Sequence, residues 1–367
     1  MSSDVSNSLQ KWVRLPPNSG LTDLKPVSIY DVTKFPDTRT QKLRSLLEQG
    51  HVTVAPLRDP ELILHSHLPH ICSLPWISMI ELLGSAYALG ASSDNLTRTY
   101  DHEVTQLVPI ARIFIRGTAI SKENWRHFLT CKEYTVTYVK ENRGYLGKVL
   151  EEYLYSGEAP LVNGYTGGLG HPFIHLAYAY EFRSEEYKTG FLAVVFESVR
   201  QDPRLDGLFR EPGINNIDLL SQEQNLAVVL EKWNAWEVIN PLAQLEESCD
   251  LAVLLALSNG NPRDSFDFFN VHIMTVAYAL RVLWHYFPTS RRVSILEQYA
   301  LFGIMTYICQ LRPQMVRTPK VFEETFGRRN DFYLNGAIKF VTEFHGWEGY
   351  GHGAAGFIPS RDGYRPK

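Results

Sequence analysis

The sequence lacks an excess of charge of either sign. Its 36 Lys and Arg residues against 40 Asp and Glu leave a net charge of −4, which offers no attraction for nucleic acid or for an anionic membrane surface. Cysteine is also scarce: the chain of 367 residues has four, far apart and without a CxxC pair. This spacing encodes neither a zinc ribbon nor a thioredoxin-like redox motif. Four cysteines in so long a chain fit a reducing compartment better than a disulfide scaffold.

Long hydrophobic runs are absent as well. The most apolar stretch, residues 272–287, contains two His and one Arg and is too short to span a bilayer. Residues 1–17 contain no apolar core of a secretory signal, so we expect a cytoplasmic protein. Aromatic residues, by contrast, are plentiful, with 19 Tyr, 19 Phe and 7 Trp. They suit a large core and also a pocket for a flat, apolar ligand.

The glycine-rich stretch 164-GYTGGLGHPF-173 does not follow a nucleotide-binding pattern. A dinucleotide fingerprint requires G-x-G-x-x-G, but counting from Gly168 and Gly170 places Phe173 at the third glycine position. No GK[ST] follows that would indicate a P-loop, and no G-x-S-x-G indicates a hydrolase nucleophile. We expect these glycines to allow a tight turn, with Pro172 at the first position of the next helix.

Helical periodicity dominates the rest of the chain and predicts an all-α fold with a bundle-like core. Two β-branched runs, residues 51–57 and 134–139, could form strands but do not alternate with helices in a βαβ pattern. We predict an extended arm over residues 1–28, a single helical domain over 29–345 and a tail over 346–367. The predicted helices cover residues 39–49, 79–90, 121–131, 143–155, 172–182, 188–200, 222–239, 244–258, 266–287, 291–312 and 331–344.

Histidines are the candidate metal ligands. His171 and His175 lie four residues apart, so they share one helix face and could bind one ion, although a capping and a core histidine would explain the same spacing. His272 lies on an otherwise apolar stripe and needs either a hydrogen-bond partner or a metal. A third cluster is 65-HSHLPH-70. Imidazoles from three helices would suit Fe, Zn, Cu or Ni, and open positions would suit iron and oxygen chemistry.

The run 168-GLGHPFIHLAYAYEF-182 resembles the GLxHPLIHLGYAYE signature of the questin oxidase-like family. This resemblance implies a helical oxidoreductase of fungal polyketide and related secondary metabolism. Its substrates would be O2 and an aromatic, anthraquinone-like polyketide. The further matching segments, in order, are 67-HLPH-70, 84-GSAYALGAS-92, 121-SKENWRHFL-129, 267-DFFNVHIMTVAYALRVL-283 and 307-YICQLRP-313.

Family members are described as Baeyer–Villiger-type oxidases that use NADPH, or as non-haem iron oxygenases. In the second group, histidines and a carboxylated lysine bind the metal. Carried over residue by residue, the resemblance implies an Fe(II) site formed by His70 (with His67 as its rival), His171, His175, His272 and Lys339.

Two features depart from the family pattern. The segment 71-ICSLPWISMIELL-83 separates HLPH from GSAYALGAS, whereas these motifs lie almost end to end in the family. Gly336 stands where the family usually has a histidine shortly before the lysine.

Three functions are compatible with these residues. The first is an iron-dependent oxygenase acting on an aromatic polyketide. The second is a metal-independent, NADPH-dependent Baeyer–Villiger-type oxidase, for which the chain has no nucleotide fingerprint. The third is a non-catalytic helical protein that binds a pathway intermediate, which would agree with the extra segment and the missing histidine.

Overall fold

A computed structural model of the chain describes residues 27–58, 76–105, 107–109, 151–157, 160–166, 168–182, 223–257, 266–310, 332–343 and 347–348. Within these ranges helices account for most of the structure, which confirms the all-α prediction. The described strands form two separate two-stranded sheets. No described helix is both long and apolar enough to cross a membrane.

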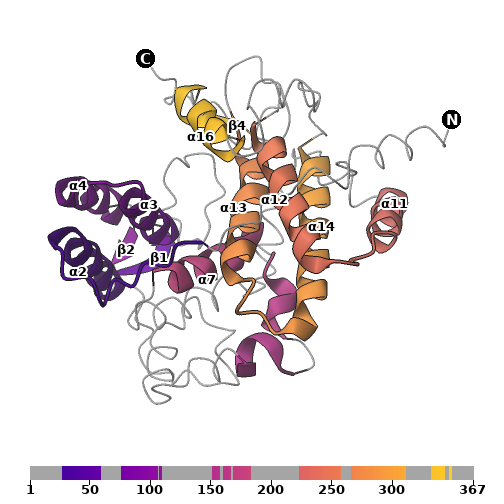
Figure 1. Cartoon of the computed structure of the whole chain (residues 1–367), viewed down its shortest axis with the longest axis horizontal. Helices are drawn as coiled ribbons and strands as arrows, with labels where there is room; N and C mark the ends of the chain where they lie inside the picture. The colour runs from indigo at the N-terminus through magenta and orange to yellow at the C-terminus, as the bar shows by residue number, and fades with distance from the viewer. Residues whose placement is uncertain are drawn as a thin grey trace.

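The first group of helices is N-terminal. Strands β1 (Val54–Arg58) and β2 (Leu107–Pro109) pair in antiparallel orientation beside these helices. Buried Leu43, Leu83 and Leu96 contribute to their common core. The helices, indigo to purple in Figure 1, are α2 (Thr38–Thr53), α3 (Trp76–Ala88) and α4 (Ser93–Val104).

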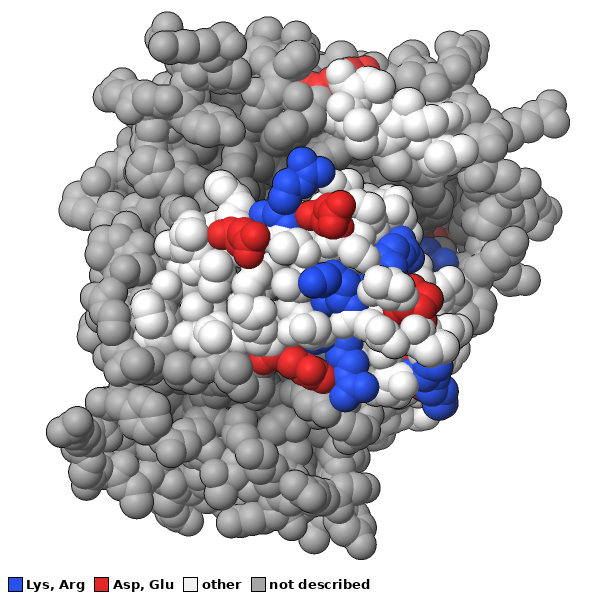
Figure 2. Space-filling model, turned by 90° about the vertical axis from the view of Figure 1, so that its left-hand side faces the viewer, with Lys and Arg blue, Asp and Glu red and all other residues white. Residues whose placement is uncertain are grey.

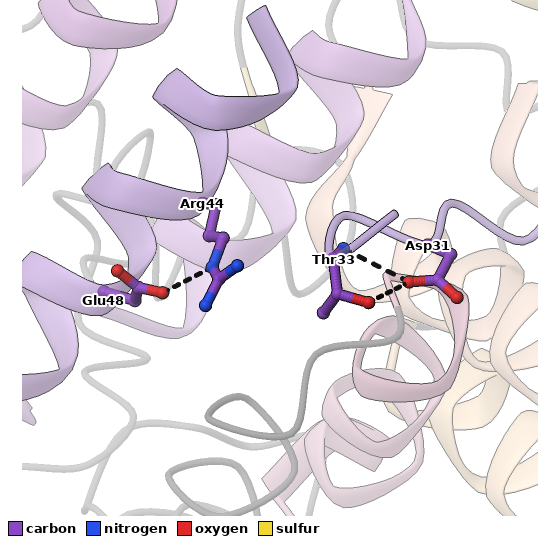
Figure 3. A network of polar contacts seen from close by, with 4 residues as sticks. All are labelled: Asp31, Thr33, Arg44 and Glu48. Carbon is purple, nitrogen blue, oxygen red and sulfur yellow. Dashed lines mark hydrogen bonds and ion pairs between the residues drawn. The ribbon is translucent and has the colours of Figure 1, made fainter. Parts of the chain in front are cut away.

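Short-range polar contacts order the surface of this group (Figure 3). On α2, Arg44 Nε donates to Glu48 Oε1 at 2.6 Å. Before α2, the Asp31 carboxylate accepts hydrogen bonds from the Thr33 hydroxyl at 2.5 Å and the Thr33 amide at 3.2 Å. The Thr33 hydroxyl, and next the Lys34 ammonium, lower the pKa of Asp31 to about 2. Solvent-accessible contacts of this kind contribute little stability, so they set local conformation rather than the fold.

The outer face of this group carries charges of both signs. Figure 2 shows Lys and Arg side chains interspersed with Asp and Glu over the described part of this face. No large patch of one sign is visible there. This distribution agrees with the small net charge and provides no polyanion-binding surface on that part of the molecule.

The second group is built around α13 (Phe268–Leu283), which lies beside α12 and α14 in Figure 1. Its core is larger than that of the first group and includes Phe173, Leu280 and Leu296. The other helices of this group are α7 (His171–Glu181), α12 (Pro241–Leu257) and α14 (Arg292–Cys309), with α11 (Glu223–Asn234) against α14 and α16 (Phe332–Glu343) against α12.

Helix α7 joins the two groups. Phe182, the residue after the helix, stacks on Tyr30 with ring centroids 5.2 Å apart. The Tyr178 hydroxyl oxygen lies 2.9 Å from Ser85 Oγ on α3. Gly84 allows this approach, because a Cβ atom there would lie 2.6 Å from Phe182 Cε2. The end of α7 is therefore held by the first group while its beginning packs in the second.

Most sequence predictions inside the described residues are confirmed. Helix ends differ from the predicted ones by five residues or fewer, except over 143–155, of which the described end forms a π-helical turn, Glu151–Tyr155. The predicted strand at 51–57 is partly wrong, since α2 continues to Thr53 and β1 begins at Val54. The elements predicted at 121–131, 134–139 and 188–200 lie outside the described residues.

Helix α4 was not predicted. Its sequence, SDNLTRTYDHEV, is mostly polar, and only Leu96, Tyr100 and Glu103 are buried. The available signal was at its start, where the Ser92 side chain accepts a hydrogen bond from the Asn95 amide at 3.2 Å, as N-cap residues do. The structure also pairs β3 (Phe266–Asp267) with β4 (Trp347–Glu348) in parallel orientation. Strand β3 occupies the first two residues of the helix predicted over 266–287, and β4 lies in the predicted tail.

The turn before α7 depends on a glycine, as predicted. Gly170 caps the helix with φ +78°, a left-handed conformation that costs other residues free energy. A Cβ atom at this position would also lie 2.2 Å from Val276 Cγ2 on α13. Both the turn and the approach of α7 to α13 therefore exclude a side chain here.

We expect Gly170→Ala to lower the free energy of unfolding by about 2–4 kcal/mol. About 1 kcal/mol comes from the left-handed backbone, and the remainder comes from overpacking against Val276. Urea unfolding would measure the loss. Gly90→Ala is the matched control, since Gly90 has φ +90° and a Cβ atom there would meet nothing within 4 Å. Equal losses in the two variants would show that the contact with Val276 is unimportant.

Candidate metal centre

Helix α7 presents two imidazoles from one face. His171 and His175 are separated by one turn, and their ring centroids lie 5.7 Å apart in a stacked arrangement. His171 is 1% exposed and His175 is fully buried. Pro172 occupies the first turn, where its missing N–H costs no hydrogen bond. The local sequence therefore both starts the helix and directs two imidazoles into the core.

Helix α13 brings the third predicted ligand to the same place. The His272 ring centroid lies 5.1 Å from that of His171, and His272 is 6% exposed. Phe269 and Val276, on the same side of α13, are buried in the core shared with α7. The close approach at Gly170 sets the separation of the two helices at this point. Three histidines distant in sequence thus become neighbours in an apolar interior.

The three imidazoles suit a metal ion by their chemistry. Imidazole nitrogen is a common ligand of iron and zinc. Two imidazoles that bind one ion at about 2.1 Å hold their ring centroids about 5 Å apart, close to the two separations observed. Within the described ranges, however, no three His, Cys, Asp or Glu side chains converge on one point as an ion requires. The described side chains therefore do not form a complete ion site by themselves.

Burial determines the protonation of His175. Desolvation lowers the pKa of His175 to about 3, because a charged imidazolium is costly in an apolar interior. His175 is consequently neutral under physiological conditions, and the neutral ring is the form that binds metal.

The other predicted ligands are placed differently. His67 and His70 lie outside the described residues. Lys339 lies on α16, where its ammonium pairs with Glu343 and lies 5.5 Å from the centroid of the Phe266 ring. In the extra segment 71–83, helix α3 begins at Trp76 and continues to Ala88. Part of this segment therefore extends the helix that carries the GSAYA motif.

Helix α7 also carries a buried carboxyl group that the sequence reasoning missed. Glu181 is 4% exposed, and its Oε1 accepts a hydrogen bond from the Tyr278 hydroxyl at 2.7 Å. Its Oε2 has no hydrogen-bond partner among the described residues. Burial raises the pKa of Glu181 to about 7, against a smaller opposing effect of the Tyr278 hydrogen bond. An acidic residue within the apolar run of α7 was the signal available in the sequence.

Two more buried polar side chains were missed. Both amide atoms of Asn270 and the hydroxyl of Tyr165 lack a hydrogen-bond partner within the described ranges. Both residues are fully buried. Buried polar groups in native proteins are normally paired, so such positions are typical places for an internal water or a bound polar group.

Comparison with known protein families gives a match. A model of the family described as questin oxidase-like matches residues 78–195 and 185–326, which together cover more than half of the chain. His171, His175 and His272 fall inside the matched ranges, whereas His70 and Lys339 fall outside them. No curated protein matches the chain significantly.

Stability should fall between pH 5 and pH 8 because of Glu181. Its pKa is about 4.5 in the unfolded chain and about 7 in the folded one, so the folded state binds more protons between these values. The stability present below pH 4.5 is lost as pH rises through 7, by about 3 kcal/mol. Urea unfolding of wild type and Glu181→Gln at pH 5 and 8 measures this difference.

The Gln variant should show a smaller decrease, because its side chain cannot ionise. Glu231→Gln, on an exposed residue paired with Lys232, should behave like the wild type. If Glu181→Gln retains the full decrease, another group is responsible for it.

Proposed function

Because the chain belongs to the questin oxidase-like family, we propose that it is an oxygen-dependent oxidoreductase of secondary metabolism that oxidises an aromatic polyketide at a non-haem iron. Membership itself implies oxidoreductase activity. The proposal goes further in naming the iron, oxygen and an anthraquinone-like substrate. The observation that supports it is the meeting of the buried imidazoles of His171, His175 and His272.

In this proposal, His171, His175 and His272 hold the iron, and the HLPH motif supplies a further imidazole, His70 rather than His67. When bound, the iron would activate O2 and polarise a ketone or phenolate oxygen of the substrate. An imidazole set of this type leaves coordination positions for both.

The surrounding residues would exclude water and hold the ligands in place. The three imidazoles are at most 6% exposed, and a dry site strengthens electrostatic interactions with a reacting group. Two of the rings lie on α7 and one on α13, and ligands on rigid helices keep their geometry better than ligands on loops. His175, kept neutral by burial, is ready to bind without first releasing a proton.

The aromatic character of this core suits a flat substrate. Phe173 packs against Tyr165 and Phe287, with ring centroids 5.0 and 6.1 Å away. These edge-to-face pairs give the core around α7 an aromatic character, and an aromatic polyketide bound beside it would make ring contacts of the same kind.

A second candidate is the metal-independent oxidase that uses NADPH. It is favoured by the lack of convergence among the described metal-binding side chains. The third possibility, a non-catalytic binding protein, predicts that the chain binds an anthraquinone-like compound and does not convert it.

We expect the wild-type protein to bind iron and His175→Ala to lose about tenfold or more in iron occupancy while remaining folded. Removing the His175 imidazole takes away one of the nitrogen ligands of the proposed site and so weakens iron binding. Metal analysis and circular dichroism of the purified proteins measure both effects. His285→Ala, which changes an exposed histidine, is the control and should retain iron.

The alternatives make different predictions in the same assay. Oxygen consumption with an anthraquinone-like substrate should depend on iron and not on NADPH. A metal-free protein that still converts the substrate with NADPH would refute the iron proposal and support the second candidate. Tight substrate binding without conversion, in air and with iron, would support the binding protein.

A further inference from the structure

The C-terminal helix α16 packs on α12 through a glycine. A Cβ atom at Gly336 would lie 2.9 Å from Leu257 Cδ1 and 3.6 Å from Val253 Cγ1. A side chain at this position would therefore require the flexible end of Leu257 to shift. The glycine that replaces the family's usual histidine is thus built into the contact between α16 and α12.

One turn further along α16, Lys339 and Phe340 contact the same aromatic ring. The Lys339 ammonium lies 5.5 Å from the centroid of the Phe266 ring, and the Phe340 ring centroid lies 4.8 Å from it. The Lys339 side chain is 14% exposed, and its ammonium also pairs with the Glu343 carboxylate on the next turn. A cation over an aromatic face and beside a carboxylate is stabilised by both.

Phe266 lies directly before the N-cap residue of α13. It is the first residue of β3, which pairs with β4. The next residue, Asp267, caps α13 by accepting hydrogen bonds from the amides of Phe269 at 2.9 Å and Asn270 at 2.8 Å. His272 follows about one turn later on α13. A contact that holds Phe266 therefore also holds the start of the helix that carries His272.

We propose that Lys339 is a positioning residue which, as a cation, holds Phe266 and the first turn of α13, and so fixes His272 against His171. In this role Lys339 is not itself a metal ligand. The effect of Lys339 on metal binding rests on the proposed function. The inference that Lys339 is a cation does not depend on that function.

Its surroundings favour a cation over a carboxylated lysine. Carboxylation would replace the ammonium by an anion. That anion would face the Glu343 carboxylate and the negative face of the Phe266 ring, and both interactions would be repulsive. Residue 336 is glycine and so offers no imidazole to support such a ligand.

Two substitutions separate the roles. Lys339→Arg keeps a cation that can contact both Glu343 and Phe266, whereas Lys339→Glu introduces a carboxylate that could replace a carboxylated lysine as a ligand. For the positioning role we expect Lys339→Arg to bind iron within about twofold of wild type, and Lys339→Glu to bind it about tenfold or more weakly. If Lys339 is instead a carboxylated ligand, Lys339→Glu should bind iron more tightly than Lys339→Arg.

Two further measurements exclude a general loss of structure. In the full chain loaded with Co²⁺, the visible absorption bands should be unchanged in Lys339→Arg and shifted in Lys339→Met, which keeps the length of the side chain but removes its charge. Phe266→Leu should produce the same shift, and combining it with Lys339→Met should add little, since both changes remove one contact. Full additivity of the two shifts would refute the coupling.

The carboxylated form is tested directly by ¹³C NMR of the wild-type protein equilibrated with ¹³C-labelled bicarbonate. A carbamate signal that disappears in Lys339→Arg would overturn the proposal. If the wild type binds no metal, the proposed function fails, but urea unfolding still tests the contact. Lys339→Arg should then leave the midpoint unchanged and Lys339→Glu should lower it, and equal midpoints in the two variants would overturn the proposal as well.

Discussion

The candidate site depends on one close contact between α7 and α13. At Gly170 the backbone of α7 approaches Val276 so closely that a Cβ atom would lie 2.2 Å from its Cγ2. The same residue has the left-handed conformation that turns the chain into the helix. His171 follows it directly and lies next to His272. Separating the helices by the width of one methyl group would move these imidazoles apart.

The interior around this contact contains several buried polar side chains. Three histidines, Glu181 and Asn270 are buried within or beside an apolar core. Burying such groups is costly unless they are neutral, paired or bound to a ligand. The chain keeps His175 neutral, as its lowered pKa shows, and raises the pKa of Glu181 towards neutrality. Polar groups retained at this cost are more typical of a functional site than of a stabilising core.

Contacts at the end of α7 and at the start of α13 attach these two helices to their neighbours. Phe182 and Tyr178 attach the end of α7 to the N-terminal helices. Phe266 and Asp267 attach the start of α13 to α16 and β4. The contacts of Phe182 and Tyr178 lie at the opposite end of α7 from His171, whereas those of Phe266 and Asp267 lie close to His272 on α13.

The amino-acid sequence alone determined most of the helices and which histidines share a face, because both follow from local spacing. The HPFIH run indicated that His171 and His175 lie on one side of a helix, and the structure agrees. Local spacing indicated neither α4, which has little apolar periodicity, nor the strands of two or three residues. Only the tertiary structure decided that His272 meets His171, that Glu181 is buried beside Tyr278, and that Lys339 contacts Phe266 and Glu343. These pairings depend on how the helices pack, and packing is set by contacts such as Gly170 with Val276 between residues far apart in the chain.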